Sequence, residues 1–85
     1  MFLSSNIKFL RKRMERTQDD VATSLDMKRS TLSGYENGIA QPAMEVLISF
    51  SNYFKIAIDT LIRVDLSTLP ESQMRQLERG YDVFL

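Results

Sequence analysis

The sequence of 85 residues contains neither cysteine nor histidine. Without cysteine, the fold cannot depend on disulfide bonds or on metals bound by thiolates. Because the commonest general bases, thiolate nucleophiles and zinc ligands are missing, we expect no enzymatic activity, metal or other cofactor. Asp19 and Asp20 are adjacent and point to different parts of a helix, which suits helix capping rather than paired acid–base chemistry.

Long apolar runs are also absent, so the sequence predicts no membrane-spanning segment. The first five residues, Met-Phe-Leu-Ser-Ser, lack the basic start and the long apolar stretch of a secretion signal. We therefore expect a cytoplasmic protein with no membrane partner. Its length suits one small domain, and a hydrophobic content of 44% suffices for a packed core.

The chain has no net charge, which by itself argues against a nucleic-acid partner. Its eleven basic and eleven acidic side chains are unevenly distributed. Residues 1–39 carry seven basic and five acidic side chains, whereas residues 40–85 carry four and six. The basic surplus of the first half suits a surface that faces DNA, although an ordinary solvated surface explains it as well.

Apolar residues recur at helical spacing, which predicts an all-α fold without strands or internal repeats. The expected helices cover residues 6–15, 18–25, 29–36, 43–54, about 58–62 and 70–84. Ser4 or Ser5 is expected to cap the first helix and Thr17 the second, and Gly38 to end the third. The fourth helix is expected to be largely buried, through its apolar residues Met44, Leu47, Ile48, Phe50, Tyr53 and Phe54.

Residues 18–36 contain two short helices joined by a short turn, the pattern of a helix-turn-helix. A polar start to the first helix, here Thr17-Gln18, suits contact with a backbone phosphate. The second helix needs small and polar residues on the face that enters the major groove. The sequence supplies them as Lys28, Arg29, Ser30, Thr31, Ser33 and Gly34, while Leu32 and Tyr35 turn toward the core.

The segments Thr17-Gln18-x-x-Val21-Ala22, Arg29–Gly38 and Pro42 resemble the lambda-repressor-like helix-turn-helix family, also called Cro/CI-type or XRE. The resemblance covers about residues 6–63. It implies a five-helix fold that binds a double-stranded DNA operator. It also implies that Thr17, Gln18 and Asn37 contact phosphates, that Arg29, Ser30, Ser33 and Gly34 face the bases, and that Lys28 reaches either.

Arg11 and Glu36 are expected to form a buried ion pair between the first and third helices. Arg11 lies one turn from the inward residues Ile7 and Met14, and Glu36 follows Tyr35. The family resemblance implies the same pair.

The sequence departs from the family pattern at several positions. Glu15 and Arg16 stand where relatives have glycine and an apolar residue, so the first helix is expected to end later or to be more exposed. Lys28 cannot cap the third helix, and the loop of residues 39–41 lacks the usual basic residues. Fewer phosphate contacts predict a shallow dependence of binding on salt. Gly34 either allows close approach of DNA or is merely tolerated, at a cost of about 1 kcal/mol relative to Ala.

The expected function is sequence-specific DNA binding as a transcriptional repressor, with residues 29–36 in the major groove. Two alternatives remain on the same fold: an antitoxin-type autoregulator, and a protein-interaction module that has lost DNA binding. The neutral charge and the uncharged loop at 39–41 favour the interaction module. The short polar side chains at 29–34 and the Thr17-Gln18 pair favour DNA.

The chain divides into a DNA-binding domain over residues 1–63 and a connector with a terminal helix over 64–85. The spacing of Met74, Leu77, Tyr81 and Phe84 is that of a coiled-coil seam, which predicts a homodimer contact. The alternative is that this stripe folds back onto the first and fifth helices.

The end of the chain is abrupt, with Val83-Phe84-Leu85, which suggests a fragment of a longer protein. Residues 63–67 and 75–80 are similar to repressors that continue into a self-cleaving Ser–Lys peptidase-like domain.

Overall fold

The structure, a computed structural model, describes residues 1–81, and over this range the chain is all-helical, as expected. Its α-helices are α1 (Leu3–Arg13), α2 (Gln18–Ser24), α3 (Arg29–Glu36), α4 (Met44–Phe54), α5 (Ile58–Arg63) and α6 (Glu71–Glu78). A short 3₁₀ helix, η1 (Leu66–Thr68), lies between α5 and α6. Among these helices, none has the length and apolar character needed to cross a membrane.

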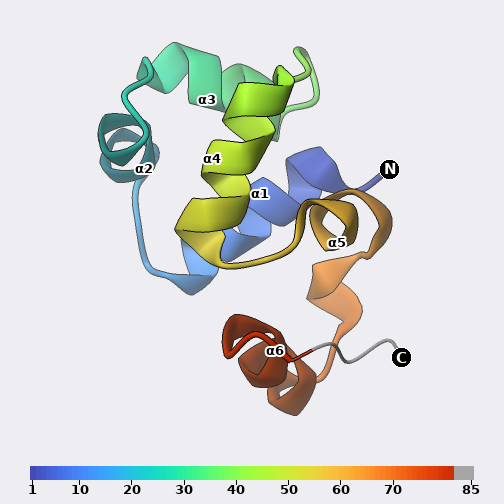
Figure 1. Cartoon of the computed structure of the whole chain (residues 1–85). Helices are drawn as coiled ribbons and strands as arrows, with labels where there is room; N and C mark the ends of the chain where they lie inside the picture. The colour runs from blue at the N-terminus through green and yellow to red at the C-terminus, as the bar shows by residue number, and fades with distance from the viewer. Residues whose placement is uncertain (82–85) are drawn as a thin grey trace.

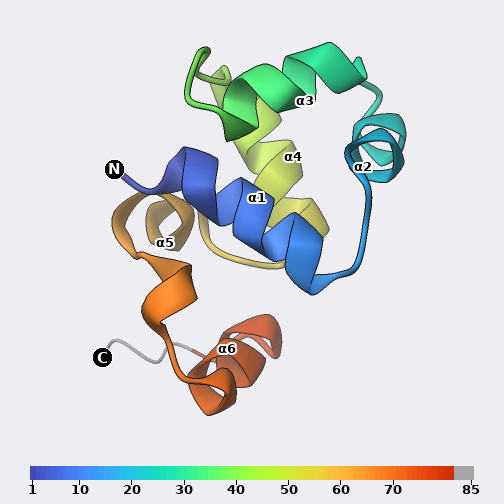
Figure 2. The ribbon, with the colours of Figure 1, turned by 180° about the vertical axis from the view of Figure 1, so that it is seen from behind.

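Helix α1 runs through the middle of the molecule, between two ends that are built from different helices (Figures 1 and 2). Helices α2 and α3 form one end, and α6 forms the other. Helix α1 connects these two ends, because it packs against α3 and its Arg13 pairs with Glu71 and Glu78 of α6.

One apolar core joins all six α-helices. Its buried members are Ile7, Leu10, Val21, Ala22, Leu32, Phe50, Phe54, Ile56, Leu61, Leu66, Met74 and Leu77. The ring of Phe50 lies at the centre, edge-on to Tyr35 and stacked on Phe54. Met14 is not part of this core, contrary to its helical spacing from Ile7 and Leu10, because α1 ends at Arg13 and the chain turns away.

Helix α1 begins three residues before the expected start. Ser4 and Ser5 lie inside its first turn, and Phe2 occupies the cap position without a side-chain capping bond. The earlier start places Asn6 inside the molecule, where its Nδ2 donates to the carbonyls of Leu61 and Val64 at 2.8 and 2.6 Å. Its Oδ1 accepts the amide of Leu66 at 3.1 Å. Asn6 therefore joins the start of α1 to the end of α5 and to η1.

Helix α1 also ends earlier than expected, through the left-handed conformation of Glu15, whose φ is 56°. The amides of Glu15 and Arg16 donate to the carbonyls of Lys12 and Arg11, which closes the helix with a Schellman motif. The expectation of a longer first helix is therefore wrong. The left-handed backbone conformation at position 15 favours glycine, because glycine adopts this conformation without steric strain.

Helix α6 stops at Glu78, six residues before the predicted end. The sequence signal for this stop is Gly80, whose φ is +90°. The amides of Gly80 and Tyr81 donate to the carbonyls of Leu77 and Gln76, again a Schellman motif. The residues predicted to continue the helix beyond Tyr81 lie outside the described range.

The prediction that α6 presents a homodimer seam is wrong for its two central residues. Met74 and Leu77 are buried in the same core as α1 and α5. Tyr81 is 64% exposed, and Phe84 lies outside the described residues. Helix α6 therefore follows the fold-back alternative. Its two apolar residues are removed from water by packing against the core of the same chain, which is favourable without a second copy.

Ion pairs also hold α6 against α1. The guanidinium of Arg13 donates twice to Glu71, both at 2.7 Å, and twice to Glu78, at 3.1 and 2.9 Å. These bonds lower the pKa of the Glu71 carboxyl and raise the pKa of Arg13. A single arginine thus spans both ends of α6.

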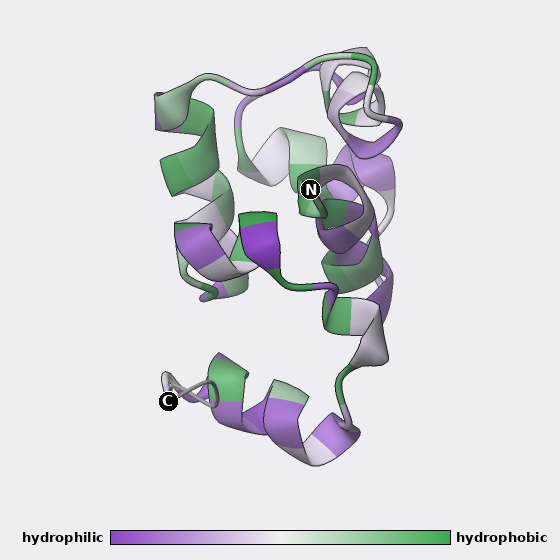
Figure 3. Cartoon of the chain, turned by 90° about the vertical axis from the view of Figure 1, so that its right-hand side faces the viewer, coloured by the Kyte–Doolittle hydropathy of each residue, from purple (hydrophilic) through white to green (hydrophobic). Residues whose placement is uncertain are grey.

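Helix α4 is less buried than its composition predicts. Phe50 and Phe54 lie in the core, but Met44 and Ile48 are 60% and 45% exposed. Figure 3 shows α4 at the left as strongly apolar, although its left side borders no other described helix. The expectation of a largely buried helix is therefore wrong for Met44 and Ile48, while Leu47 and Tyr53 are partly buried.

Candidate nucleic-acid interface

Helices α2 and α3 form the predicted helix-turn-helix, joined by residues 25–28. The turn depends on Asp26, which adopts a left-handed conformation with φ of 54°. Val21 and Ala22 of α2 and Leu32 of α3 are buried, so both helices are fixed by the core. The start of α2 and the outer face of α3 consequently lie on the same end of the molecule (Figure 1).

The local sequence sets the start of α2 through a capping box. The hydroxyl of Thr17 accepts the amide of Asp20 at 3.1 Å, and the Asp20 carboxylate accepts the amide of Thr17 at 2.9 Å. The backbone amide lowers the pKa of Asp20, because it stabilises the ionised carboxylate. The Thr17 hydroxyl can still donate its own proton, since a hydroxyl both accepts and donates.

The outer face of α3 is polar and accessible. Ser30 and Asn37 are exposed and Ser33 is partly exposed, at spacings of three and four residues, which places them on one helix face. Nδ2 of Asn37 donates to the hydroxyl of Ser33 at 3.2 Å. Thr31 is partly buried beside this stripe.

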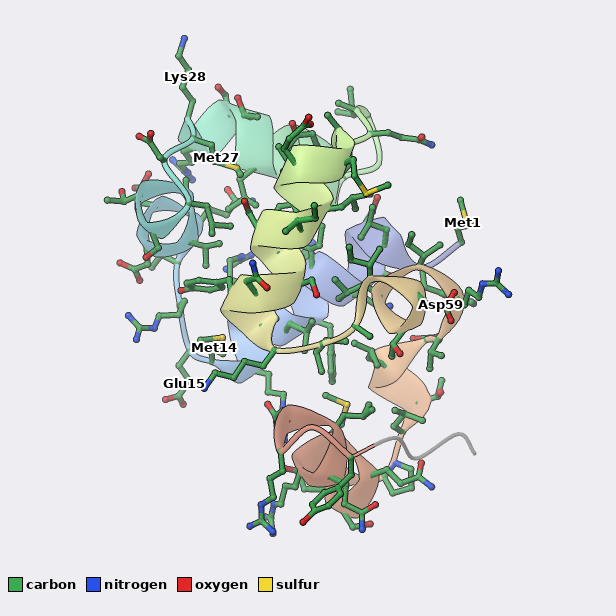
Figure 4. All side chains as sticks on the ribbon, viewed as in Figure 1. Met1, Met14, Glu15, Met27, Lys28 and Asp59 are labelled. Atoms are coloured by element: carbon green, nitrogen blue, oxygen red, sulfur yellow. The ribbon has the colours of Figure 1, made fainter. Side chains whose placement is uncertain are left out.

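The start of α3 carries the two basic residues of the motif. Lys28 occupies the cap position in an extended conformation and makes no capping bond, as expected for lysine. Its side chain extends away from the ribbon at the outer edge of the molecule (Figure 4). Arg29 follows it, also exposed, so α3 presents two cations at its first turn.

Gly34 lies beside the loop that follows α3, and its carbonyl accepts the amides of Ile39 and Ala40. A Cβ added at Gly34 would lie 3.9 Å from the Cβ of Ala40, an ordinary van der Waals distance. The packing of the chain itself therefore does not require glycine here. This spacing is compatible with both alternatives for Gly34, close approach of DNA and mere tolerance of glycine.

The predicted ion pair between Arg11 and Glu36 is confirmed. Nε of Arg11 donates to Oε2 of Glu36 at 2.7 Å, and Nη2 donates to Oε1 at 3.0 Å. The two residues are 9% and 5% exposed. The remaining guanidinium nitrogen, Nη1, donates to the carbonyl of Arg16 at 2.9 Å. The pair therefore joins α1, the α1–α2 turn and the end of α3.

Gln18 extends this buried pair to the surface. Its Nε2 donates to Oε1 of Glu36 at 3.2 Å, and its Oε1 accepts from Nε of Arg29 at 3.4 Å. The exposed cation of α3 is thus connected through Gln18 to the ion pair in the interior. Sequence reasoning identified these residues and paired Arg11 with Glu36, but it did not predict the two bonds of Gln18, which form only when α2 and α3 pack together.

A hollow between the α1–α2 turn and α3 adds a residue that the sequence reasoning did not select. Its lining includes Arg16, Gln18 and Arg29 together with Glu15 and Asp19. Arg16 is exposed and borders the same hollow as Arg29. A basic residue directly before the cap of α2 is the signal that could have identified it.

The charge of this end is mixed rather than strongly basic. Arg16, Lys28 and Arg29 are accompanied by four exposed carboxylates, those of Glu15, Asp19, Asp20 and Asp26. The loop of residues 39–41 is exposed and uncharged. The interface therefore suits specific polar contacts better than a large electrostatic attraction.

Two curated relatives match the chain. It is 33% identical over 60 residues to an uncharacterized HTH-type transcriptional regulator, YqaE, of Bacillus subtilis, a match that covers 71% of this chain and 52% of YqaE. It is also 33% identical over 76 residues to the HTH-type transcriptional activator BcrR of Enterococcus faecalis, with 88% of this chain and 37% of BcrR covered. The chain thus spans about half or less of these relatives. No solved structure gave a significant match.

A family model adds the decisive comparison. The model for the helix-turn-helix family matches residues 7–61, from α1 through α5, and so covers most of the chain. Together with the α2–α3 geometry, this match shows that the chain belongs to the Cro/CI-type (XRE) helix-turn-helix family of DNA-binding transcription regulators.

Proposed function

We propose that this chain reads a specific double-stranded DNA sequence by placing α3 in the major groove, as the DNA-binding part of a transcriptional repressor. The observation that carries the proposal is the polar outer face of α3, whose position is fixed by a buried ion pair to α1. A helix can report base sequence only if its position relative to the DNA backbone is well defined. This function requires that the chain and the DNA share one compartment, which we propose is the cytoplasm.

Contacts with the DNA backbone come from both edges of the interface. We assign phosphate contacts to Thr17 and Gln18 at the start of α2 and to Asn37 at the end of α3. Lys28 reaches either a phosphate or a base. These residues set the register of α3 and carry no sequence information directly.

Base recognition comes from the outer face of α3. Arg29 donates to guanine, the commonest specific contact in the major groove, and Ser30 and Ser33 reach neighbouring bases. Thr31 and Gly34 border this face and allow its close approach. The bond between Gln18 and Nε of Arg29 supports the assignment, because it leaves the two terminal amino groups of Arg29 for guanine O6 and N7.

Repression is the regulatory outcome we propose, because a domain bound over a promoter excludes other proteins without any further contact surface. The relative BcrR is described as an activator, so regulation of the opposite sign is the competing outcome. A reporter gene fused to the selected binding site decides between them: repression lowers its expression when the chain is supplied, and activation raises it.

The second candidate is a protein-interaction module on the same fold that no longer binds DNA. The zero net charge and the uncharged loop at 39–41 favour it. Selection of bound sequences from a random DNA pool separates the two. Enrichment of one motif supports the DNA proposal, and a pool without enrichment at low salt removes it.

Two substitutions test the assignment of residues. Arg29→Ala should cost about 1–3 kcal/mol on the preferred site and relax discrimination at one base pair. Gln18→Ala should weaken binding to all sequences and, because Gln18 holds Arg29, should relax the same base pair by a smaller amount. Arg75→Ala serves as the matched control, since Arg75 is an exposed arginine on α6 at the far end of the molecule. Fluorescence anisotropy on the selected site and its single-base variants measures all three. An unchanged motif in Arg29→Ala would refute the assignment.

A further inference from the structure

The turn between α1 and α2 contains an arginine whose backbone is firmly held. The amide of Arg16 donates to the carbonyl of Arg11 at 3.1 Å, and the carbonyl of Arg16 accepts a hydrogen bond from Nη1 of Arg11 at 2.9 Å. Arg11 is itself fixed by its buried pair with Glu36, at the end of α3. The backbone of Arg16 therefore keeps a defined position relative to α3, although Arg16 itself is exposed.

Arg16 borders the hollow between this turn and α3. Thr17, Gln18 and Arg29 line the same hollow. Arg16 and Arg29 are both exposed, so two arginines from different elements border one concave surface beside Thr17. Guanidinium groups form their strongest hydrogen bonds with ionised acceptors, and with a phosphate they can form two at once. The hollow therefore suits a phosphate group.

The carboxylates near the hollow do not occupy Arg16. Glu15 and Asp19 also line the hollow, but the side chain of Glu15 points away from α2 and α3 (Figure 4). The pKa of the Asp20 carboxyl is lowered mainly by its hydrogen bond with the Thr17 amide and to a smaller extent by the charge of Arg16. Over residues 1–81, however, Arg16 forms no ion pair with any carboxylate. Its five N–H donors are thus available to a ligand.

We infer that Arg16 binds a phosphate of the DNA backbone, an inference that rests on the proposed function. Arg29 starts the helix that reads the bases and borders the same hollow, so the backbone beside those bases passes the hollow. The guanidinium of Arg16 forms two parallel hydrogen bonds to the phosphate oxygens, a geometry that its planar group provides and an ammonium does not. Thr17 and Gln18 contact the same stretch of backbone from the start of α2.

This contact places a backbone cation at the start of α2 rather than after α3. The loop of residues 39–41 is exposed and uncharged, so it offers phosphates no cation. One arginine–phosphate contact contributes about 0.9 to the slope of the logarithm of the binding constant against the logarithm of salt concentration. Because phosphates carry no direct sequence information, loss of Arg16 weakens binding to all sequences by the same factor.

The salt dependence of binding tests this contact. Arg16→Ala should lower the slope by about 0.9 and weaken the selected site and its single-base variants equally. Arg16→Lys should keep most of the slope, because the charge remains. Arg79→Ala is the matched control, since it removes an exposed arginine at the α6 end and should leave the slope unchanged. An unchanged slope in Arg16→Ala, with circular dichroism showing a folded chain, would overturn the inference.

Neutral phosphate analogues test whether the contact is direct. Methylphosphonates, which remove the charge of one phosphate, are placed singly along both strands of the selected site. At one backbone position, the wild-type chain should lose several-fold in affinity, whereas Arg16→Ala should lose little. Arg79→Ala should respond as the wild type does. If every position weakens wild type and Arg16→Ala by the same factor, Arg16 acts only as a countercharge to Asp19 and Asp20, and the inference is wrong.

A duplex of arbitrary sequence separates this inference from the proposed function. Backbone contacts do not require a specific site, so Arg16→Ala should lower the salt slope on this duplex as well. A chain that shows this loss but selects no motif from a random pool keeps the Arg16 contact and refutes sequence-specific reading. A chain that selects a motif with the same slope in wild type and Arg16→Ala refutes the contact alone.

Discussion

Two arginines on α1 hold opposite ends of the molecule in different surroundings. Arg11 lies in the interior and makes a bidentate pair with Glu36, which fixes the end of α3. Arg13, two residues later, is partly exposed and pairs with Glu71 and Glu78 of α6, which are themselves more exposed. The same residue type on the same helix thus holds the end formed by α2 and α3 and the end formed by α6.

The difference in burial determines what each arginine contributes. A buried pair leaves an uncompensated charge when one partner is lost, so it enforces one arrangement of α1 and α3. An exposed pair is screened by water and salt and contributes at most about 1 kcal/mol. Burial of Met74 and Leu77 must therefore supply most of the free energy that holds α6 in place, since one buried side chain of this size contributes about 1.5–3 kcal/mol.

The largest effect is expected from the buried pair. Arg11→Ala should lower the free energy of unfolding by about 3–5 kcal/mol, because Glu36 remains buried without its partner. Urea denaturation followed by circular dichroism measures the loss. Arg13→Ala is the matched control, and equal losses in the two variants would refute the distinction between them.

The apolar contact of α6 is expected to rank second. Met74→Ala should lower the free energy of unfolding by about 2–5 kcal/mol, through lost burial and a cavity in the core. Met44→Ala is its control on α4, where the side chain is mostly exposed, and it should change stability little. A small effect of Met74→Ala would mean that α6 does not belong to the core in solution.

The exposed pairs of α6 should give a smaller effect that depends on pH. Arg13 lowers the pKa of Glu71 in the folded chain. The stabilisation of the fold by this ion pair is therefore fully present at pH values above 4.5, the ordinary pKa of the carboxyl. It is lost as the pH falls through the lowered pKa of the folded state. Glu71→Gln should therefore destabilise the chain at pH 7 and have little effect at acid pH.

The cause of that pH dependence can be isolated in a second background. With Arg13→Ala already present, Glu71→Gln should no longer change stability differently at the two pH values. Thermal denaturation of the four chains at both pH values provides the comparison. A persistent difference would assign the lowered pKa to a group other than Arg13.

The smallest effect is expected in the turn that connects the two regions. Glu15→Gly should raise the free energy of unfolding by about 0.5–1 kcal/mol, because glycine adopts the left-handed conformation without strain but loses more freedom on folding. Glu15→Ala keeps the Cβ and should leave stability nearly unchanged. If both variants stabilise equally, removal of the acidic charge rather than the backbone conformation is responsible.

The sequence predicted the bounds of α2 and α3 well because their signals are local. Thr17 and Asp20 cap α2 over a span of three residues, and Gly38 closes α3 directly after its last turn. Helices α2 and α3 therefore agree with the expected ranges within one residue at each end. The extent of α6 was predictable in principle from Gly80, but the apolar spacing that continues past it gave the stronger signal.

Burial could not be read from apolar composition alone. Met44 and Met74 are the same residue type in amphipathic helices, yet one is exposed and the other lies in the core. Which face of a helix is covered depends on the path of the rest of the chain. The prediction for α6 failed for this reason, since the spacing of Met74 and Leu77 suits a partner helix and the chain's own core equally.

The sequence by itself determined the helix-turn-helix, its capping residues Thr17 and Gly38, and the pairing of Arg11 with Glu36, because spacing and family pattern encode all three. Only the tertiary structure decided the roles of Asn6, Gln18 and Arg13. The partners of Asn6 and Arg13 lie about sixty residues further along the chain. The side chain of Gln18 connects Glu36 to Arg29. These contacts form only after the helices pack, and neither the local spacing nor the family pattern encodes them.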